Sequence, residues 1–179
     1  KYIWPYCITE EMRKNLSELS KKLKEDGHKI YIITGRVHTT EDGIRGNLFR
    51  KMLLSWLKKN GFEYDEIIYV NENNSAEEKL NACKENNIDL MIEDKTENIE
   101  VIKDVSSVIC VNAEYNENAD FGDIVRIDNF DNGYEVINSV LEKLVKLEYL
   151  YLNLFLNLIC LAKKIYQKKK KVIFMLVII

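Results

Sequence analysis

The feature that most constrains the fold is a regular alternation of short apolar runs with longer amphipathic stretches. The apolar runs lie at residues 30–33, 66–70, 88–92 and 107–111, and strands covered on both faces are typically apolar in this way. Stretches with apolar residues at helical spacing separate them. Because a crossover helix joins parallel strands, the alternation predicts an α/β fold with a doubly wound, Rossmann-like parallel sheet.

The helical stretches carry signals at their ends. The first begins at Thr9, which two glutamates follow, and stops at Gly27. Ser75 and Glu78 have the spacing of a capping box, and Thr96 is expected to cap a short helix. The predicted helices span residues 9–26, 47–60, 75–86 and 133–145, and a short edge strand is predicted at residues 123–127.

Composition limits the class of protein. The 179 residues, 46% of them hydrophobic, are enough for one domain with a substantial core. The net charge is −3, so the chain lacks the basic surplus typical of nucleic-acid binding, and no nucleic-acid partner is expected. The four cysteines are widely spaced without a Cys-x-x-Cys pair, and no signal-peptide pattern appears at the start. A reduced, cytoplasmic protein is therefore expected.

The C-terminal part departs from this pattern. Residues 147–162, LEYLYLNLFLNLICLA, are apolar around most of a helix, and a lysine-rich stretch and the apolar end VIFMLVII follow. As a membrane span the helix is short, since a bilayer needs about 20 residues, and Glu148, Asn153 and Asn157 interrupt it. A helix that docks on the domain or a partner also fits, as does the start of a span in the final apolar residues. Contact of residues 147–179 with a membrane or a partner is therefore an open prediction.

Polar side chains lie at the carboxyl ends of the predicted strands, where doubly wound sheets bind ligands. Thr34 ends the first strand, and Glu93 and Asp94 end the third. Lys79 lies near the start of the preceding helix. A hydroxyl that donates a hydrogen bond, an ammonium that neutralises charge and a carboxylate that holds Mg²⁺ together suit a phosphate. Each residue alone also has an ordinary explanation: the acids, for example, would favour the positive end of the helix at Thr96.

The order of these residues resembles that of the haloacid dehalogenase-like superfamily of phosphatases. The superfamily's second motif, a hydrophobic strand that ends in Ser or Thr, is matched by IYIITGR with Thr34. Its third motif, a lysine upstream of the fourth strand, is matched by Lys79 in KLNACKENNIDLMIED. Its fourth, an acidic pair or Gly-Asp at a strand end, is matched by Glu93 and Asp94. LKEDGHKIYIITGR and WLKKNGFEYDEIIYV are similar to the 5′-nucleotidase branch, and the resemblance covers roughly residues 9–138.

The resemblance implies a phosphomonoester hydrolase that requires Mg²⁺ and acts on a small phosphorylated substrate, for example a nucleoside monophosphate. It implies that Thr34 and Lys79 are catalytic and stabilise the transferring phosphoryl group. It also implies that Asp94 is a metal ligand, with Glu93 as the second candidate. The candidates for substrate binding are Thr34, Gly35, Arg36 and, on the same loop, His38.

The superfamily's first motif, a strand followed by Asp-x-Asp that supplies the aspartyl nucleophile, has no match in the chain. The resemblance therefore implies an N-terminally truncated enzyme that is inactive alone. Residues 1–8 would be a remnant of the cap region, 9–145 a partial core and 146–179 an apolar and basic C-terminal helix and tail. Family order puts the missing strand between those ending at Thr34 and Asp94, which are expected to stay unpaired or to pair with each other. The alternative is a non-catalytic module that docks through its C-terminal helix.

Overall fold

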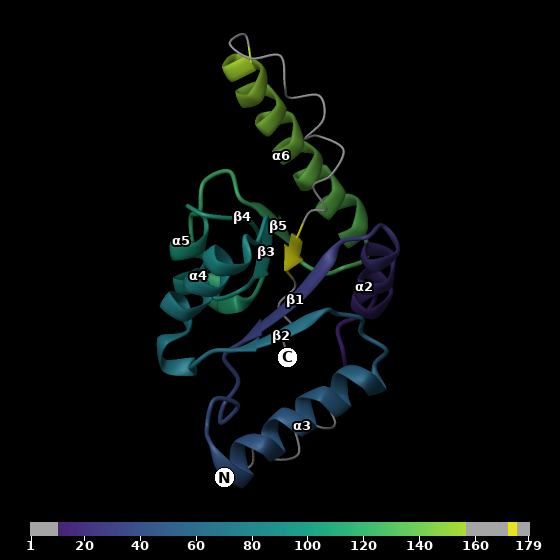
Figure 1. The fold of residues 1–179 in the computed structure, drawn as a ribbon, viewed down its shortest axis with the longest axis vertical. Helices are drawn as coiled ribbons and strands as arrows, with labels where there is room; N and C mark the ends of the chain where they lie inside the picture. The colour runs from purple at the N-terminus through teal and green to yellow at the C-terminus, as the bar shows by residue number, and fades with distance from the viewer. Residues whose placement is uncertain (1–10, 157–171, 175–179) are drawn as a thin grey trace.

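The computed structural model describes residues 11–156 and 172–174, and these form a six-stranded parallel sheet with helices on both faces (Figure 1). The strands lie in the order β2-β1-β6-β3-β4-β5, and every neighbouring pair is parallel. This arrangement confirms the predicted α/β class with a Rossmann-like parallel sheet. The elements in chain order are α2 (Leu16–Glu25), β1 (Lys29–Thr34), α3 (Gly43–Lys59), β2 (Glu66–Tyr69), η1 (Glu72–Asn74), α4 (Ser75–Asn86), β3 (Leu90–Glu93), α5 (Thr96–Ile102), β4 (Ser107–Val111), η2 (Glu114–Asn116), β5 (Val125–Ile127), α6 (Gly133–Leu156) and β6 (Val172–Phe174).

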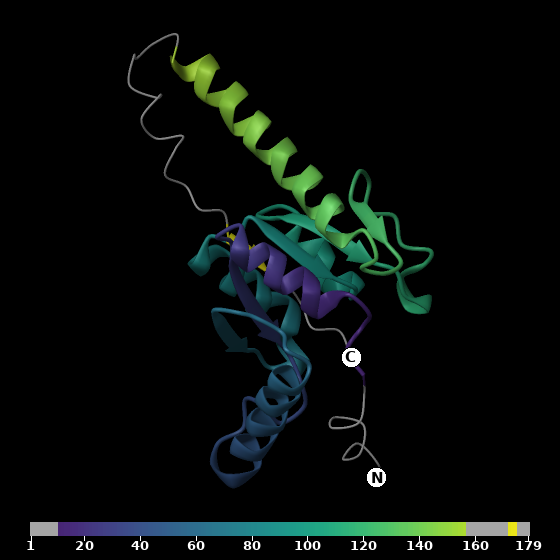
Figure 2. The same cartoon turned by 90° about the vertical axis from the view of Figure 1, so that its right-hand side faces the viewer.

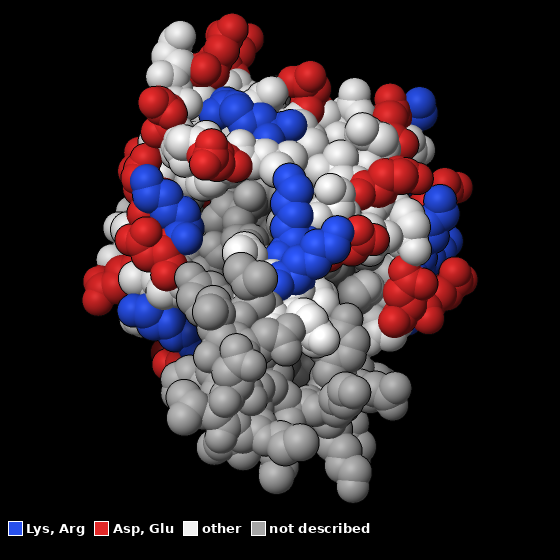
Figure 3. All heavy atoms as spheres, turned by 90° about the horizontal axis from the view of Figure 1, so that it is seen from above, with Lys and Arg blue, Asp and Glu red and all other residues white. Residues whose placement is uncertain are grey.

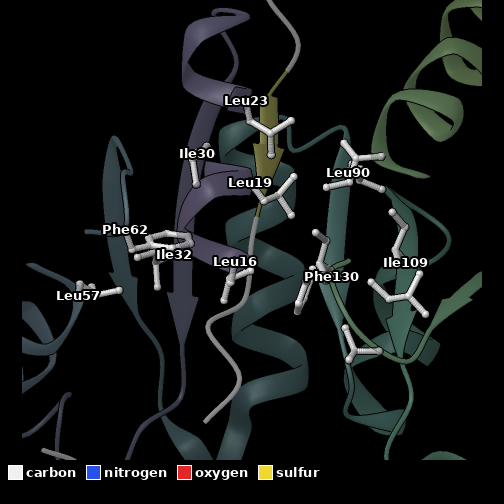
Figure 4. Packing of buried hydrophobic residues seen from close by; sticks show 14 of the residues in the cluster. Leu16, Leu19, Leu23, Ile30, Ile32, Leu57, Phe62, Leu90, Ile109 and Phe130 are labelled. Atoms are coloured by element: carbon white, nitrogen blue, oxygen red, sulfur yellow. The ribbon is translucent and has the colours of Figure 1, made fainter. Parts of the chain in front are cut away.

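Two apolar layers explain why the strands are continuously hydrophobic. Successive side chains of a strand point to opposite faces of the sheet, and β1 supplies both layers. Ile30 and Ile32 pack with residues of α2, α3 and α6, as Figure 4 shows for the leucines of α2. Ile33 packs in the other layer, with residues of α4 and α5. The predicted strands lie within a few residues of the observed ones because burial on both faces leaves a local apolar signal.

The start of α2 is later than predicted. The helix begins at Leu16, and the expected start at Thr9 lies outside the described residues. Asn15, directly before the helix, has φ 66°, a left-handed conformation that a right-handed helix excludes. The end of the helix agrees with the sequence, since Gly27 has φ +82°, a conformation that glycine adopts readily after a helix.

The capping predictions for α4 and α5 are wrong. Ser75 is the first residue of α4 rather than its cap, and its hydroxyl donates to Asn98 Oδ1 at 3.1 Å. Glu78 accepts a hydrogen bond from the backbone N–H of Asn71. Thr96 is likewise the first residue of α5. The buried amide of Asn98 competes for the Ser75 hydroxyl, and this tertiary contact is absent from the local pattern.

The strand β6 corrects the prediction for the centre of the sheet. The strands β1 and β3 neither stay unpaired nor pair with each other, because β6, yellow in Figure 1, lies between them. Ile173 is in register with Ile30 of β1 and with Leu90 of β3. The segment Val-Ile-Phe has strong strand propensity, and its backbone provides hydrogen-bonding groups to both neighbours. A C-terminal segment therefore holds the position that was expected to be empty.

The helix α6 is longer than predicted and extends beyond the sheet (Figures 1 and 2). It continues from the expected end near residue 145 to Leu156, because the intervening sequence contains no Gly or Pro and many leucines. The side chains of Leu147 and Tyr149 are exposed. None of the helices within the described ranges is long and apolar enough to cross a membrane. Contact of residues 147–179 with a membrane or a partner stays a prediction, since much of that segment lies outside the described residues.

Positive and negative side chains are interspersed on the face seen in Figure 3.

One charged group holds the start of β1 in place. Asp65 accepts hydrogen bonds from Lys24 Nζ at 2.5 Å and from the backbone N–H of Ile30 at 2.7 Å. Burial acts to raise the pKa of Asp65, but the hydrogen bonds from Lys24 and Ile30 outweigh it, and the pKa is lowered. The folded state therefore favours the ionised form of Asp65.

Candidate active site

The carboxyl edge of the sheet collects the predicted polar residues. Glu93 is the last residue of β3 and is completely buried, and Asp94 follows it with 6% of its surface exposed. Thr34 ends β1, two positions away in the sheet, and is also buried. The carbonyl of Thr34 accepts a hydrogen bond from the N–H of Val70 at 3.0 Å. Polar residues this deeply buried at strand ends need partners that compensate for lost hydration.

Glu93 has such partners for both carboxylate oxygens. Its Oε2 accepts from Lys79 Nζ of α4 at 2.6 Å and from Asn98 Nδ2 of α5 at 3.0 Å. Its Oε1 accepts from the backbone N–H groups of Asp94 at 3.1 Å and Lys95 at 3.2 Å. The four donors fix the carboxylate in the interior, where an isolated charge would be costly. The structure thus brings two predicted site residues, Lys79 and Glu93, into a buried ion pair.

The electrostatics of this pair are dominated by burial. Burial raises the pKa of Glu93, while the ammonium of Lys79 and the backbone hydrogen bond from Lys95 act to lower it. The Lys79 side chain is 5% exposed, so solvent screens the pair weakly. Either partner would be left as an uncompensated buried charge if the other were removed.

The loop after β1 packs against the start of α4. A Cβ atom placed on Gly35 would lie 3.4 Å from the Ser75 Cβ and 3.5 Å from the Glu72 Cα. Ser75 donates to Asn98, which in turn donates to Glu93. The close approach of Gly35 to Ser75 and the two hydrogen bonds that follow therefore link the end of β1 to the ion pair at the end of β3.

Asp94 is held by η2, the short helix that follows β4. The Tyr115 hydroxyl donates to Asp94 Oδ2, and the Asn116 side-chain amide donates to the Asp94 carbonyl at 2.6 Å. Asp94 therefore faces different partners from Glu93, although the two are adjacent in sequence. Its carboxylate accepts a hydrogen bond from a hydroxyl group.

The loop that carries Arg36 and His38 forms its own cluster. The Arg36 carbonyl accepts from the backbone N–H and the hydroxyl of Thr39, at 3.1 and 2.7 Å, which closes a turn. His38 Nδ1 lies 2.5 Å from Glu41 Oε1, and its ring packs edge-on against Phe49 with centroids 4.8 Å apart. These contacts tie His38 to its own loop and to α3. The structure does not join His38 to the ion pair through them.

Three residues of the site were missed by sequence reasoning. Asn98 links Ser75 to Glu93, and Tyr115 and Asn116 hold Asp94. Tyr115 and Asn116 follow β4 at the carboxyl edge, so the rule that selected Thr34 points to their region of the chain. The rule does not say which polar residue of the segment NAEYN turns inward, because that depends on the path of the turn.

The contacts of Asp94 and Glu93 bear on which of the two could hold a metal ion. Within the described ranges, no three His, Cys, Asp or Glu side chains come together as a complete metal shell. Mg²⁺ does not need such a shell, because it is commonly bound by one or two carboxylates, with waters and substrate phosphate oxygens as the other ligands. Asp94 fits the role of one such ligand. Glu93 fits it less well, since both of its oxygens already accept hydrogen bonds.

The fold and these contacts define a doubly wound α/β protein with a polar site at the carboxyl edge of a parallel sheet. No protein-family model matches the chain. The chain is 24% identical over 144 residues to a nucleotidase from Clostridium acetobutylicum, and the match covers 80% of this chain and 68% of the relative. It is therefore similar to a nucleotidase over most of its length.

Among solved structures, NADH-dependent butanol dehydrogenase A from Thermotoga maritima matches with 19% identity and a TM-score of 0.27. The match covers 54% of this chain, and the chain spans 24% of the dehydrogenase. So low a TM-score does not indicate a common fold, and the dehydrogenase has no bearing on the function of this chain.

Proposed function

We propose that the chain is part of a Mg²⁺-dependent phosphomonoester hydrolase whose substrate is a nucleoside monophosphate. The observation that carries the proposal is the series of contacts from the end of β1, through Gly35, Ser75 and Asn98, to the Lys79–Glu93 pair beside Asp94. The similarity to a nucleotidase over 80% of the chain supports the same class of substrate.

Each residue has a distinct role in this proposal. Lys79 has three N–H donors, and within the described part of the chain it donates to Glu93, so in this proposal its other N–H groups bind the oxygens of a phosphoryl group. Glu93 positions the ammonium. The Thr34 hydroxyl donates a second hydrogen bond to the phosphoryl group, and the glycine at position 35 leaves its backbone N–H open to a close approach. These donors stabilise the charge on the phosphoryl oxygens during transfer.

Asp94 is the proposed Mg²⁺ ligand. Mg²⁺ held by Asp94 would supply positive charge that offsets the charge on the phosphate oxygens. Asp94 directly follows Glu93, which holds the Lys79 ammonium, so the proposed metal ligand is one residue away from the anchor of the proposed phosphate-binding cation. Because β3 pairs with β4 and β6, the strand end that carries Glu93 is held in place before the substrate binds.

The nucleophile is proposed to come from a strand that this chain does not contain. A carboxylate oxygen would attack phosphorus, and the bond between phosphorus and the ester oxygen would break; that oxygen would take a proton from water and leave as the nucleoside. A second water would then attack the acyl phosphate, which releases inorganic phosphate and regenerates the carboxylate. The sequence contains no Asp-x-Asp, and β6 lies in the central position of the sheet between β1 and β3. A nucleophile-bearing strand would have to take this position in place of β6.

Turnover on a panel of nucleoside monophosphates with Mg²⁺ tests the proposal. The chain as it stands is compared with a form extended upstream to the natural start, and Asp94→Asn is made in the extended form. Asp104→Asn is the matched control, because Asp104 is an exposed carboxylate away from the site. We expect activity only in the extended form, lost in Asp94→Asn and retained in Asp104→Asn. A folded extended form without turnover would refute the phosphatase assignment.

A further inference from the structure

The short helix η2 is attached unusually firmly to the residue that follows β3. Asn116 is completely buried, and its amide donates to the carbonyls of Asp94 at 2.6 Å and Val111 at 2.9 Å. Its Oδ1 accepts from the backbone N–H of Ala113 at 3.1 Å and from the guanidinium of Arg126 at 2.9 Å. Two of these hydrogen bonds hold η2 against the ends of β3 and β4, one closes η2 onto its own first turn, and one joins it to β5.

Tyr115 is presented to Asp94 by this attachment. The residue is 66% exposed, so it contributes little to the core, but its hydroxyl donates inward to Asp94 Oδ2. The hydroxyl is the donor of this hydrogen bond, and the carboxylate oxygen Oδ2 is the acceptor. Among the described residues, no hydrogen bond to Asp94 Oδ1 is found.

We propose that Tyr115 is a positioning residue that orients the Asp94 carboxylate for a divalent cation. This proposal rests on the metal role proposed above for Asp94. The hydroxyl holds Oδ2 and leaves Oδ1 as the oxygen that binds the metal. Carboxylate ligands are commonly fixed by a second hydrogen-bonding group, and loss of that group weakens metal binding by about 10- to 100-fold. Asn116 keeps the turn in place when the hydroxyl is removed, so the effect is confined to the carboxylate.

Mn²⁺ binding to the complete chain, measured by electron paramagnetic resonance of the free ion, tests the proposal. We expect Tyr115→Phe to raise the dissociation constant by about 10- to 100-fold and Asp94→Asn to abolish specific binding. Tyr134→Phe is the matched control, because the Tyr134 hydroxyl also donates to an aspartate, Asp26, at 2.6 Å but on the exposed surface. This control should bind Mn²⁺ as the wild type does.

The outcomes separate the two proposals. If Asp94→Asn abolishes binding while Tyr115→Phe leaves it unchanged, Asp94 is a ligand and Tyr115 does not position it. Tighter binding in Tyr115→Phe would show that the hydroxyl competes with the metal, which also overturns the proposal. If the wild type does not bind Mn²⁺, or Asp94→Asn binds equally well, the metal role of Asp94 fails and the role of Tyr115 fails with it. A purely structural role for Tyr115 would lower the urea midpoint without moving the dissociation constant.

Discussion

The buried pair of Lys79 and Glu93 predicts a large energetic coupling that can be measured directly. In Lys79→Met, Glu93 keeps three of its four hydrogen-bond donors but loses its cation, in a position without solvent exposure. In Glu93→Gln, the ammonium of Lys79 loses its anion. Removing one partner of a buried ion pair costs about 3–5 kcal/mol. Each single substitution should therefore lower the free energy of unfolding by about that amount.

The double variant Lys79→Met/Glu93→Gln removes both charges, so neither is left uncompensated. We expect its cost to be at least ~2 kcal/mol smaller than the sum of the two single costs, because the stranded-charge penalty is counted twice in that sum. Urea denaturation followed by tryptophan fluorescence measures all four proteins, and Trp56 is buried in the core. The cost of Lys79→Met should shrink as the pH is lowered, because a buried Glu93 with a raised pKa then takes up a proton in the folded state.

A matched control exists on the surface. Lys103 and Glu100 are also 2.6 Å apart, but their side chains are 32% and 44% exposed, and solvent screens exposed pairs strongly. The same cycle on this pair should show a much smaller coupling than the cycle on the buried pair. Costs at the buried pair that add within ~0.5 kcal/mol, or a coupling no larger than that of the control, would refute the reasoning.

Two further predictions concern the sheet. Asp65→Asn should lower the free energy of unfolding by about 1 kcal/mol at pH 7, a modest value because the carboxylate is one-third exposed. The folded-state pKa of Asp65 lies below its ordinary value of 3.8, so this contribution is present above pH 3.8 and is lost as the pH falls through the folded-state pKa. The urea midpoints of wild type and variant should therefore converge in acid. Ile173→Pro removes a backbone N–H from the central strand and should cost at least ~1 kcal/mol, the value of one hydrogen bond; an unchanged urea midpoint would mean that β6 does not pair with β1 and β3 in solution.

The strands could be predicted from the sequence because their burial is recorded locally. A parallel strand covered on both faces must be apolar at nearly every position, and residues 107–111 show this without reference to any distant residue. Helix ends were less predictable. The left-handed Asn15 and the contact of Ser75 with Asn98 moved the starts of two helices, and both depend on packing rather than on capping patterns.

The candidate site was only partly predictable. The strand-end rule selected Thr34, Glu93 and Asp94, and the resemblance added Lys79, but neither showed that Glu93 would be saturated with donors while Asp94 would face Tyr115. Lys79 lies 14 residues from Glu93 in the sequence, and Tyr115 lies 21 residues from Asp94. Burial of a polar group is a local requirement, but its partner is chosen by how the elements pack.

By itself the sequence determined strands β1 to β5, the helices between them and the edge of the sheet at which the polar residues gather, because apolar content and strand direction are properties of short segments. Only the tertiary structure decided which strands are neighbours and which polar side chains form hydrogen bonds or ion pairs with each other. The central position of β6 is the clearest case. Three apolar residues near the C-terminus have no local property that assigns them to the middle of a sheet, and they lie there because β1 and β3 present backbone groups that must be paired.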